Sequence, residues 1–306
     1  MVIESYNTCN YWQCFDNQDE INKLKYVNRN IFMINLRIDK MGMLNKINSI
    51  ILLMVLCFHT YAQNDFCSTK NTSFKEGERL TFHVYYNMGF IWINAGNANF
   101  NITTEDMNGH KVYHIIGDGK TANSYEWFYK VKDKYETYID KETMAPVRFI
   151  RNVHEGSTKI YQDITFNHEA LQANSNNKVY TVTRCTQDVL SAIYFARNID
   201  YNKYRPGDKI PFTMFLDDKL YSLYIKYEGK EQIKTKMGIF NSIKIVPLLI
   251  EGTIFDGGEK MTVWVSDDQN RVPLRVESPI LVGSIKVDLM EFEGLRNPFS
   301  SMISRD

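Results

Sequence analysis

Two histidines, His110 and His114, have a spacing that suggests metal binding, because imidazoles four residues apart meet on one face of a helix. The residues around them, however, alternate between apolar and polar, which predicts a β-strand. On a strand this spacing leaves the two side chains about 13 Å apart, too far to share one metal ion. We therefore expect surface histidines on a strand, and no metal site.

Serine and cysteine chemistry needs residues gathered around a nucleophile. A Gly-x-Ser-x-Gly turn commonly presents a serine nucleophile, and the sequence contains no such motif. It also contains no Cys-x-x-Cys pair for redox chemistry or zinc. His83, His154 and His168 are present, but no spacing singles one out as a base. The sequence therefore predicts no catalytic residue.

Glycine-rich and acidic turn sequences in the chain resemble phosphate-binding and calcium-binding loops. Gly117-Asp-Gly119-Lys120 lacks the length and spacing of a phosphate loop, so we interpret it as a hairpin turn or strand end. Asp256-Gly-Gly-Glu259 and Asp267-Asp268 have carboxylates that suit calcium, but acidic turn residues are usually only solvated. We expect no cofactor and no bound metal.

Large apolar side chains in Tyr85-Tyr-Asn-Met-Gly-Phe-Ile-Trp92, and again near Trp264, exceed what one wet face of a sheet requires. On the concave side of a curved sheet they would line an apolar cavity suited to a lipid or another amphiphile. The alternative is that they fill the core of a sandwich. The candidate ligand-lining residues are Tyr85, Phe90, Trp92, Trp127, Tyr194 and Trp264.

The elements that must position these side chains are mostly strands. Alternation between apolar and polar residues predicts strands with one buried and one wet face, most clearly over residues 80–85, 160–166, 271–277 and 285–289. Short turn sequences between such runs favour antiparallel hairpins; they are Asn108-Gly109, Asp217-Asp218, Glu228-Gly229-Lys230, Asp256-Gly257-Gly258 and residues 267–270. We predict a mainly β fold: a single large antiparallel curved sheet, either an open barrel or a sandwich.

One or two short helices should interrupt this sheet. Residues 123–131 form either a short helix or an irregular aromatic loop. Residues 186–197 favour a helix, with Val189, Ile193 and Ala196 on one face and Asp188 near the positive end of the helix dipole. Such a helix would plug or cap the curved sheet.

The N-terminal region has the order of a secretory signal. Lys46 precedes the apolar run 50–58, and Thr60-Tyr61-Ala62 ends it, so we expect cleavage between Ala62 and Gln63. A spanning helix needs about 20 apolar residues, which makes an uncleaved anchor the weaker alternative. We interpret residues 1–40 as an upstream extension from a misassigned start, or else a genuine leader, 41–62 as the signal peptide and 63–306 as a single β domain. The expected location is the periplasm or outer envelope.

The charge balance limits the classes of binding partner that we expect, and the cysteine content limits the possible disulfides. The chain has 36 basic and 36 acidic residues, so no net field attracts nucleic acid or anionic lipid. We expect no nucleic acid partner and no spanning membrane helix in the mature chain. Only Cys67 and Cys185 remain after cleavage, and an oxidising compartment permits a disulfide between them. Two unrelated buried thiols are the alternative.

Six runs of residues, in this order, resemble the exported bacterial family called domain of unknown function 3108, and its Bacteroidetes members in particular. The first of them is Phe74-Lys-Glu-Gly-Glu-Arg-Leu-Thr-Phe82, and the others cover residues 90–98, 188–197, 261–268, 272–278 and 282–286. The resemblance spans nearly the whole mature chain. It implies an envelope location, and it brings no established activity or catalytic residues.

A second, smaller likeness is to periplasmic lipoprotein carriers, in the strand, turn and strand of residues 135–148. Their fold, an open curved sheet over an apolar cavity, suits the pattern. We therefore expect a non-enzymatic envelope protein that binds or carries an apolar or amphiphilic ligand. The alternative is a scaffold or interaction module in envelope assembly, whose partner is another envelope protein, and a hydrolase comes third.

Overall fold

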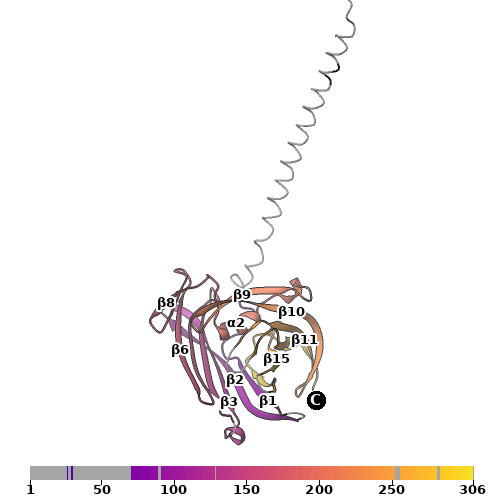
Figure 1. Cartoon of the computed structure of the whole chain (residues 1–306). Coiled ribbons are helices and arrows are strands. Elements are labelled where there is room, and N and C mark those ends of the chain that lie inside the picture. Colours follow the sequence, from indigo (N-terminus) through magenta and orange to yellow (C-terminus); the bar gives the residue numbers. More distant parts are fainter. Residues whose placement is uncertain are drawn as a thin grey trace, which may run out of the picture. The chain divides into compact units, whose positions relative to one another are not determined.

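The computed structural model describes Tyr26, Arg29 and residues 70–88, 91–127, 129–251, 256–280 and 283–305. The chain divides into two units, Met1–Tyr61 and Ala62–Asp306. All but two of the described residues belong to the second unit, which Figure 1 shows as a strongly curved sheet around helix α2 (Val189–Ala196).

The first half of the sheet is a run of consecutive strands. They are β1 (Arg79–Met88), β2 (Ile91–Met107), β3 (His110–Thr121), β4 (Lys132–Asp140), β5 (Pro146–Glu155), β6 (Thr158–Asn167), β7 (Gln172–Ser175) and β8 (Lys178–Thr181). The second half follows α2. It contains β9 (Lys209–Leu216), β10 (Lys219–Thr235), β11 (Gly238–Pro247), β14 (Thr262–Ser266), β15 (Pro273–Pro279), β16 (Ser284–Glu293) and β17 (Met302–Ser304).

The two halves join through β1, which pairs antiparallel with both β2 and β16. The strand order is β8-β7-β6-β5-β4-β3-β2-β1-β16-β15-β14-β11-β10-β9, with β17 beside β11, and all of these pairs are antiparallel. Strands β8 and β9 form the two edges, so the sheet is open. The predicted mainly β fold with one large antiparallel curved sheet is confirmed. A separate hairpin pairs β12 (Leu249–Glu251) with β13 (Asp256–Gly258).

The turns explain where the chain reverses. Asn108 and Gly109 both have positive φ, at 55° and 84°, as do Asp217 and Asp218, at 51° and 58°. Two such residues form the turn whose twist matches that of the flanking strands. Two predicted turns are wrong: Glu228-Gly229-Lys230 lies inside β10 as a bulge, and Asp256-Gly257-Gly258 is β13. The local sequence suits both structures, because a bulge and a turn can each use a glycine with positive φ.

Helix α2 begins and ends inside the predicted segment. The Asp188 carboxylate accepts hydrogen bonds from the backbone N–H groups of Leu190 and Ser191, both at 2.8 Å, and so caps the helix. The helix contacts β4 and β9. The predicted apolar face is wrong, because Ile193 is 41% exposed and the helix buries Leu190, Ser191, Ala192, Tyr194 and Phe195 instead. The buried residues are spread around the helix, so it does not have the single buried face of a surface helix. Residues 123–125 form a short 3-10 helix.

Side chains hold the β9–β10 turn against the first half of the sheet. The turn Asp217-Asp218 joins β9 to β10, and its carboxylates bind Arg151 on β5 and Gln162 on β6. Arg151 and Gln162 are opposite each other in the β5–β6 pair, so one turn contacts two neighbouring strands of the other half. We call this set of contacts the edge latch. It joins strands that no backbone ladder connects.

Candidate functional site

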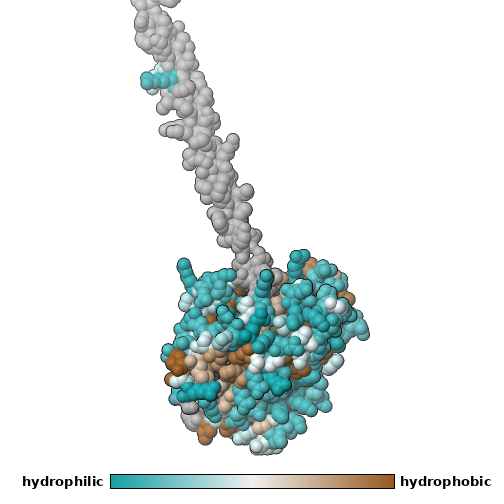
Figure 2. All heavy atoms as spheres, turned by 180° about the vertical axis from the view of Figure 1, so that it is seen from behind, coloured by the Kyte–Doolittle hydropathy of each residue, from teal (hydrophilic) through white to brown (hydrophobic). Residues whose placement is uncertain are grey.

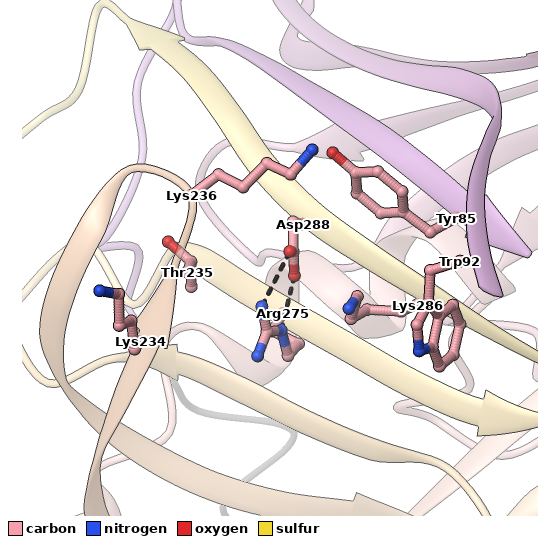
Figure 3. Close-up of a pocket in the computed structure, with 8 residues that line it drawn as sticks. All are labelled: Tyr85, Trp92, Lys234, Thr235, Lys236, Arg275, Lys286 and Asp288. Atoms are coloured by element: carbon pink, nitrogen blue, oxygen red, sulfur yellow. Dashed lines mark hydrogen bonds and ion pairs between the residues drawn. The ribbon is translucent and has the colours of Figure 1, made fainter. Parts of the chain in front are cut away.

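A hollow of about 380 Å³ lies where both halves of the sheet meet. Figure 3 shows its side chains, which come from β1, β2, β15, β16, the end of β10 and the β10–β11 turn. They are Tyr85, Trp92, Lys234, Thr235, Lys236, Arg275, Lys286 and Asp288. Four of these side chains are basic and one is acidic, so the hollow has a positive lining.

Arg275 and Asp288 form an internal pair at the base of this lining. The Arg275 guanidinium donates to both Asp288 oxygens, at 2.6 Å from Nε and 2.8 Å from Nη2. The hydrogen bonds with Asp288 raise the pKa of Arg275. Asp288 is buried, and Arg275 also lies 3.8 Å from Glu277. The charges cancel within the pair, and Lys236 and Lys286 remain as positive groups of the hollow.

Aromatic rings, rather than acids, hold two of these lysines. Lys286 Nζ lies 4.5 Å from the centre of the Trp92 ring and 5.6 Å from that of Tyr85, and Lys236 Nζ lies 4.6 Å from the same Tyr85 ring. Such contacts position an ammonium group without neutralising it. Among the described ion pairs, none joins Lys236 or Lys286 to a carboxylate. Their charge remains available to an anion.

The strand register brings these residues together. Tyr85 lies opposite Lys286 across the β1–β16 pair, and Arg275 lies opposite Asp288 across the β15–β16 pair. Side chains directly opposite on neighbouring strands share a face. Residues far apart in the sequence therefore converge on one face of three adjacent strands.

The other face of the same strands is apolar. Tyr86 is opposite both Ile93 and Ile285, while Val276 is opposite both Val287 and Val263. We call this set the apolar band: Val84, Tyr86, Ile93, Val263, Val276, Ile285 and Val287, all half-buried. Figure 2 shows apolar residues exposed together in a hollowed part of an otherwise hydrophilic surface.

The predicted lining residues do not all meet. Tyr85 and Trp92 line the hollow, whereas Tyr194 lies in the core against Phe74, with ring centres 5.0 Å apart. Trp264 is half-buried and donates from Nε1 to Glu231 at 2.6 Å, and Trp127 is 83% exposed in the loop after β3. Phe90 lies outside the described residues. Sequence reasoning missed all four basic side chains, because each is an ordinary residue of a polar strand face or turn.

His110 and His114, the pair with metal-like spacing in the sequence, differ in their surroundings. Both lie on β3 as predicted, but His114 is only 8% exposed, so the expectation of a surface histidine is wrong for it. Its Nδ1 lies 2.6 Å from Glu105 and its Nε2 lies 2.9 Å from Glu136, and the ring stacks on Tyr138. Burial alone would raise the pKa of Glu136, but hydrogen bonds from Lys134 and His114 outweigh it and lower that pKa. Both ring nitrogens of His114 are occupied, which fits a structural role.

The chemistry of the hollow is that of binding. Thr235 supplies a hydroxyl, and the remaining lining groups supply positive charge and aromatic surface. The described residues contain no group of three or more His, Cys, Asp or Glu arranged to hold a metal. No helix in the described part of the chain has the length and apolarity to cross a membrane.

Cys185 is in a disulfide. The predicted partner, Cys67, lies outside the described residues. The pairing of these two cysteines stays a prediction.

The single open sheet, curled around one helix, defines a β-barrel-like protein. The description "Protein of unknown function (DUF3108)" fits residues 81–290, more than half of the chain. The chain belongs to the DUF3108 family, which confirms the resemblance seen in its sequence. No curated protein matches it.

Solved structures place the fold. The chain is similar to a β-barrel-like protein of domain of unknown function DUF1849 from Brucella abortus, with 8% identity and a TM-score of 0.50, over 74% of this chain and 99% of that one. An exported-protein candidate with a YmcC-like fold from Bacteroides fragilis has 10% identity and a TM-score of 0.32, over 74% and 100%. A lipoprotein candidate from Parabacteroides distasonis has 12% identity and a TM-score of 0.34, over 74% and 99%. At such identities the first likeness shows the fold alone.

Proposed function

We propose that this protein is an exported, non-enzymatic envelope protein that binds the anionic part of an amphiphilic ligand in the hollow between β1, β15, β16 and the β10–β11 turn. The observation that carries the proposal is the arrangement of Lys236 and Lys286. Both ammonium groups face the hollow against aromatic rings, and neither has a carboxylate partner among the described residues.

The electrostatics of the hollow favour an anion. An ammonium group held over a ring retains its charge, and a phosphate, sulfate or carboxylate entering the hollow would gain charge-assisted hydrogen bonds. Thr235 adds a neutral donor, and the Trp92 side chain, which is 39% exposed, offers apolar surface to a neighbour of the anion. This combination fits a charged group attached to a hydrophobic or ring-shaped body.

The size of the hollow limits how much of the ligand it holds. Pockets for small ligands are about 300–1,000 Å³, so 380 Å³ lies near the lower end. It has room for a headgroup and little else. The apolar cavity expected from sequence is therefore replaced, in this proposal, by a charged site with aromatic walls.

Binding of a soluble anionic amphiphile tests the proposal. Isothermal titration calorimetry with dodecyl phosphate, kept below its micelle concentration, should show saturable binding, and neutral dodecyl maltoside should not bind. Lys286→Ala removes one charge-assisted contact, so it should weaken dodecyl phosphate binding about tenfold or more.

Lys159→Ala is the matched control, because Lys159 is an exposed lysine on β6, which β3, β4 and β5 separate from β2 in the sheet. It should leave the affinity for dodecyl phosphate unchanged. Equal effects of the two substitutions, or equal binding of the neutral detergent, would show that the hollow is not the binding site.

The exported location rests on the signal-like order around residues 46–62. The intact mass of the protein purified from its own cells tests it. We expect a chain beginning at Gln63, and a mass that retains residues 41–62 would contradict cleavage there.

A scaffold role is the second candidate, favoured by the sheet edge at β8. Among the described strands, β8 pairs only with β7, and its Val179 is exposed. An unpaired edge can accept a strand from another chain. Val179→Lys should abolish such pairing without changing dodecyl phosphate binding, which separates the two candidates.

A further inference from the structure

We propose that the end of the sheet formed by the β1–β2 and β15–β16 hairpins docks on the surface of an anionic lipid bilayer, so that the hollow receives lipid headgroups in place. This inference rests on the proposed function and names the physical form in which the ligand is met. We call this part of the molecule the docking end; its described residues are Ile91, Trp92, Pro279, Ile280 and Lys286.

The two hairpins end side by side. Met88 pairs with Ile91 and Pro279 pairs with Ser284, and these are the last described pairs of the two hairpins. Tyr86 pairs with Ile285, which places β1 and β16 in register next to the two reversals. A Cβ on Gly283 would lie 3.0 Å from the backbone oxygen of Asn87, a further sign of how closely they approach.

Apolar side chains at the docking end are left in water. Ile91 is 66% exposed and Trp92 is 39% exposed, and Pro279 is also exposed. Exposed isoleucine and tryptophan lose favourable burial that contact with lipid would restore. Ile93 and Ile285 lie on the face opposite to that of Trp92 and are half-buried, so apolar surface occurs on both faces of these strands.

Positive charge lies directly behind this apolar surface. Lys286 Nζ is 4.5 Å from the Trp92 ring, and Lys236 and Lys234 line the same hollow. Tryptophan favours the level of lipid headgroups, and a lysine just above it reaches the phosphates. Two carboxylates share the face of Lys286: Asp288, which is paired with Arg275, and Glu277, which is opposite Lys286 and lies 3.8 Å from the same guanidinium. Charge and apolarity are thus ordered as they are in a bilayer interface.

The volume of the hollow supports a bilayer over a free lipid. It holds a headgroup, whereas the acyl chains need an apolar environment of their own. When the docking end rests on a membrane, those chains stay in the bilayer and only the headgroup enters. A lipid extracted whole would leave its chains against a charged lining.

Vesicle flotation tests the inference with the protein purified from its own cells. Vesicles of phosphatidylglycerol and phosphatidylcholine should carry the protein upward, and vesicles of phosphatidylcholine alone should not. Lys286→Ala should lower binding to the anionic vesicles about fivefold, because each lysine near an anionic surface contributes about that factor. Lys159→Ala should have no effect.

Lipids brominated along their acyl chains locate the contact. They should quench tryptophan fluorescence in the wild type, and the quenching should fall strongly in Trp92→Phe and persist in Trp127→Phe. Trp127 is the control, because it is 83% exposed on the loop between β3 and β4 and does not line the hollow. Ile91→Ser should weaken flotation while the urea unfolding transition stays unchanged.

The outcomes separate this inference from the proposed function. Lysine-dependent binding of dodecyl phosphate without flotation would overturn docking and leave the anion site standing. Equal flotation with neutral vesicles, or quenching that survives Trp92→Phe, would also overturn docking at this end. If the wild-type protein binds neither dodecyl phosphate nor anionic vesicles, both the anion site and the membrane docking are overturned.

Discussion

Arg197 and Glu78 form an ion pair that is closed off from solvent. The Arg197 Nη1 and Nη2 atoms lie 2.6 Å and 2.9 Å from the two Glu78 oxygens, and the residues are 2% and 0% exposed. Burial lowers the pKa of Arg197, but its contact with Glu78 outweighs that and raises it. The pair connects the residue before β1 to the end of α2, and Arg197 Nε also donates to the Asn270 carbonyl at 3.0 Å. It therefore joins both halves of the sheet.

Glu78→Gln should be strongly destabilising. The substitution keeps the shape but leaves the Arg197 charge buried without a counter-ion, which typically costs about 3–5 kcal/mol. Urea unfolding followed by circular dichroism measures the loss. Glu293→Gln is the control, since its pair with Arg79 is 3.8 Å long and mostly exposed; it should change stability by less than about 0.5 kcal/mol. Similar losses for both would contradict this role.

Asp133 should make the protein less stable as the pH rises. Burial and the neighbouring Glu155 carboxyl raise the pKa of Asp133 from 3.8 to about 6. Between these values the folded state holds more protons than the unfolded state, so stability falls with increasing pH. Asp133→Asn removes the charge, so its unfolding midpoint should exceed that of the wild type at pH 7.5 and approach it at pH 4. A constant difference between these pH values would refute the shift.

The edge latch should respond to pH in the opposite direction. Hydrogen bonds from Ser175, Tyr180 and Gln162 lower the pKa of Asp218 below 3.8. Its stabilising contribution is present above 3.8 and is lost as the pH falls through the lowered pKa. Hydrogen exchange should report faster opening of β8 and β9 in Asp218→Ala than in the wild type at pH 6. Asp106→Ala, on the exposed β2–β3 hairpin, should leave these amides unchanged.

Reduction should destabilise the protein through Cys185. This residue is in a disulfide, and closing a long loop stabilises a fold by about 2–4 kcal/mol in most measured cases. Cys185→Ala should lower the free energy of unfolding by that amount under oxidising conditions and make dithiothreitol ineffective. Peptide mapping without reduction should recover Cys67 linked to Cys185; a link to another cysteine would contradict the pairing.

Periodicity was enough to predict the sheet. A one-sided strand such as β6 alternates so regularly that each of its side chains can be assigned to a face. The sequence predicts a turn at Gly229 where the structure has a bulge, because only pairing with β11 decides whether a glycine with positive φ reverses the chain or widens a strand. Local sequence contains no information about that partner.

The hollow could not be predicted, for a related reason. Lys234 and Lys286 are about fifty residues apart, and what brings them together is the order of β11, β14, β15 and β16 in the sheet. His114 is a similar case, because its two glutamates come from the strands on either side of β3. Sequence indicated two members of the hollow, Tyr85 and Trp92, through their aromatic character alone.

The pairing of β1 with β16 sets the order in which this fold can assemble. The first half is a series of hairpins between chain neighbours, which can form as the polypeptide emerges. β1 must nevertheless wait, with one edge unsatisfied, until nearly the last strand has been synthesised. Throughout that interval the nascent chain offers an open template for mispairing. A premature stop before residue 284 would make this temporary hazard permanent.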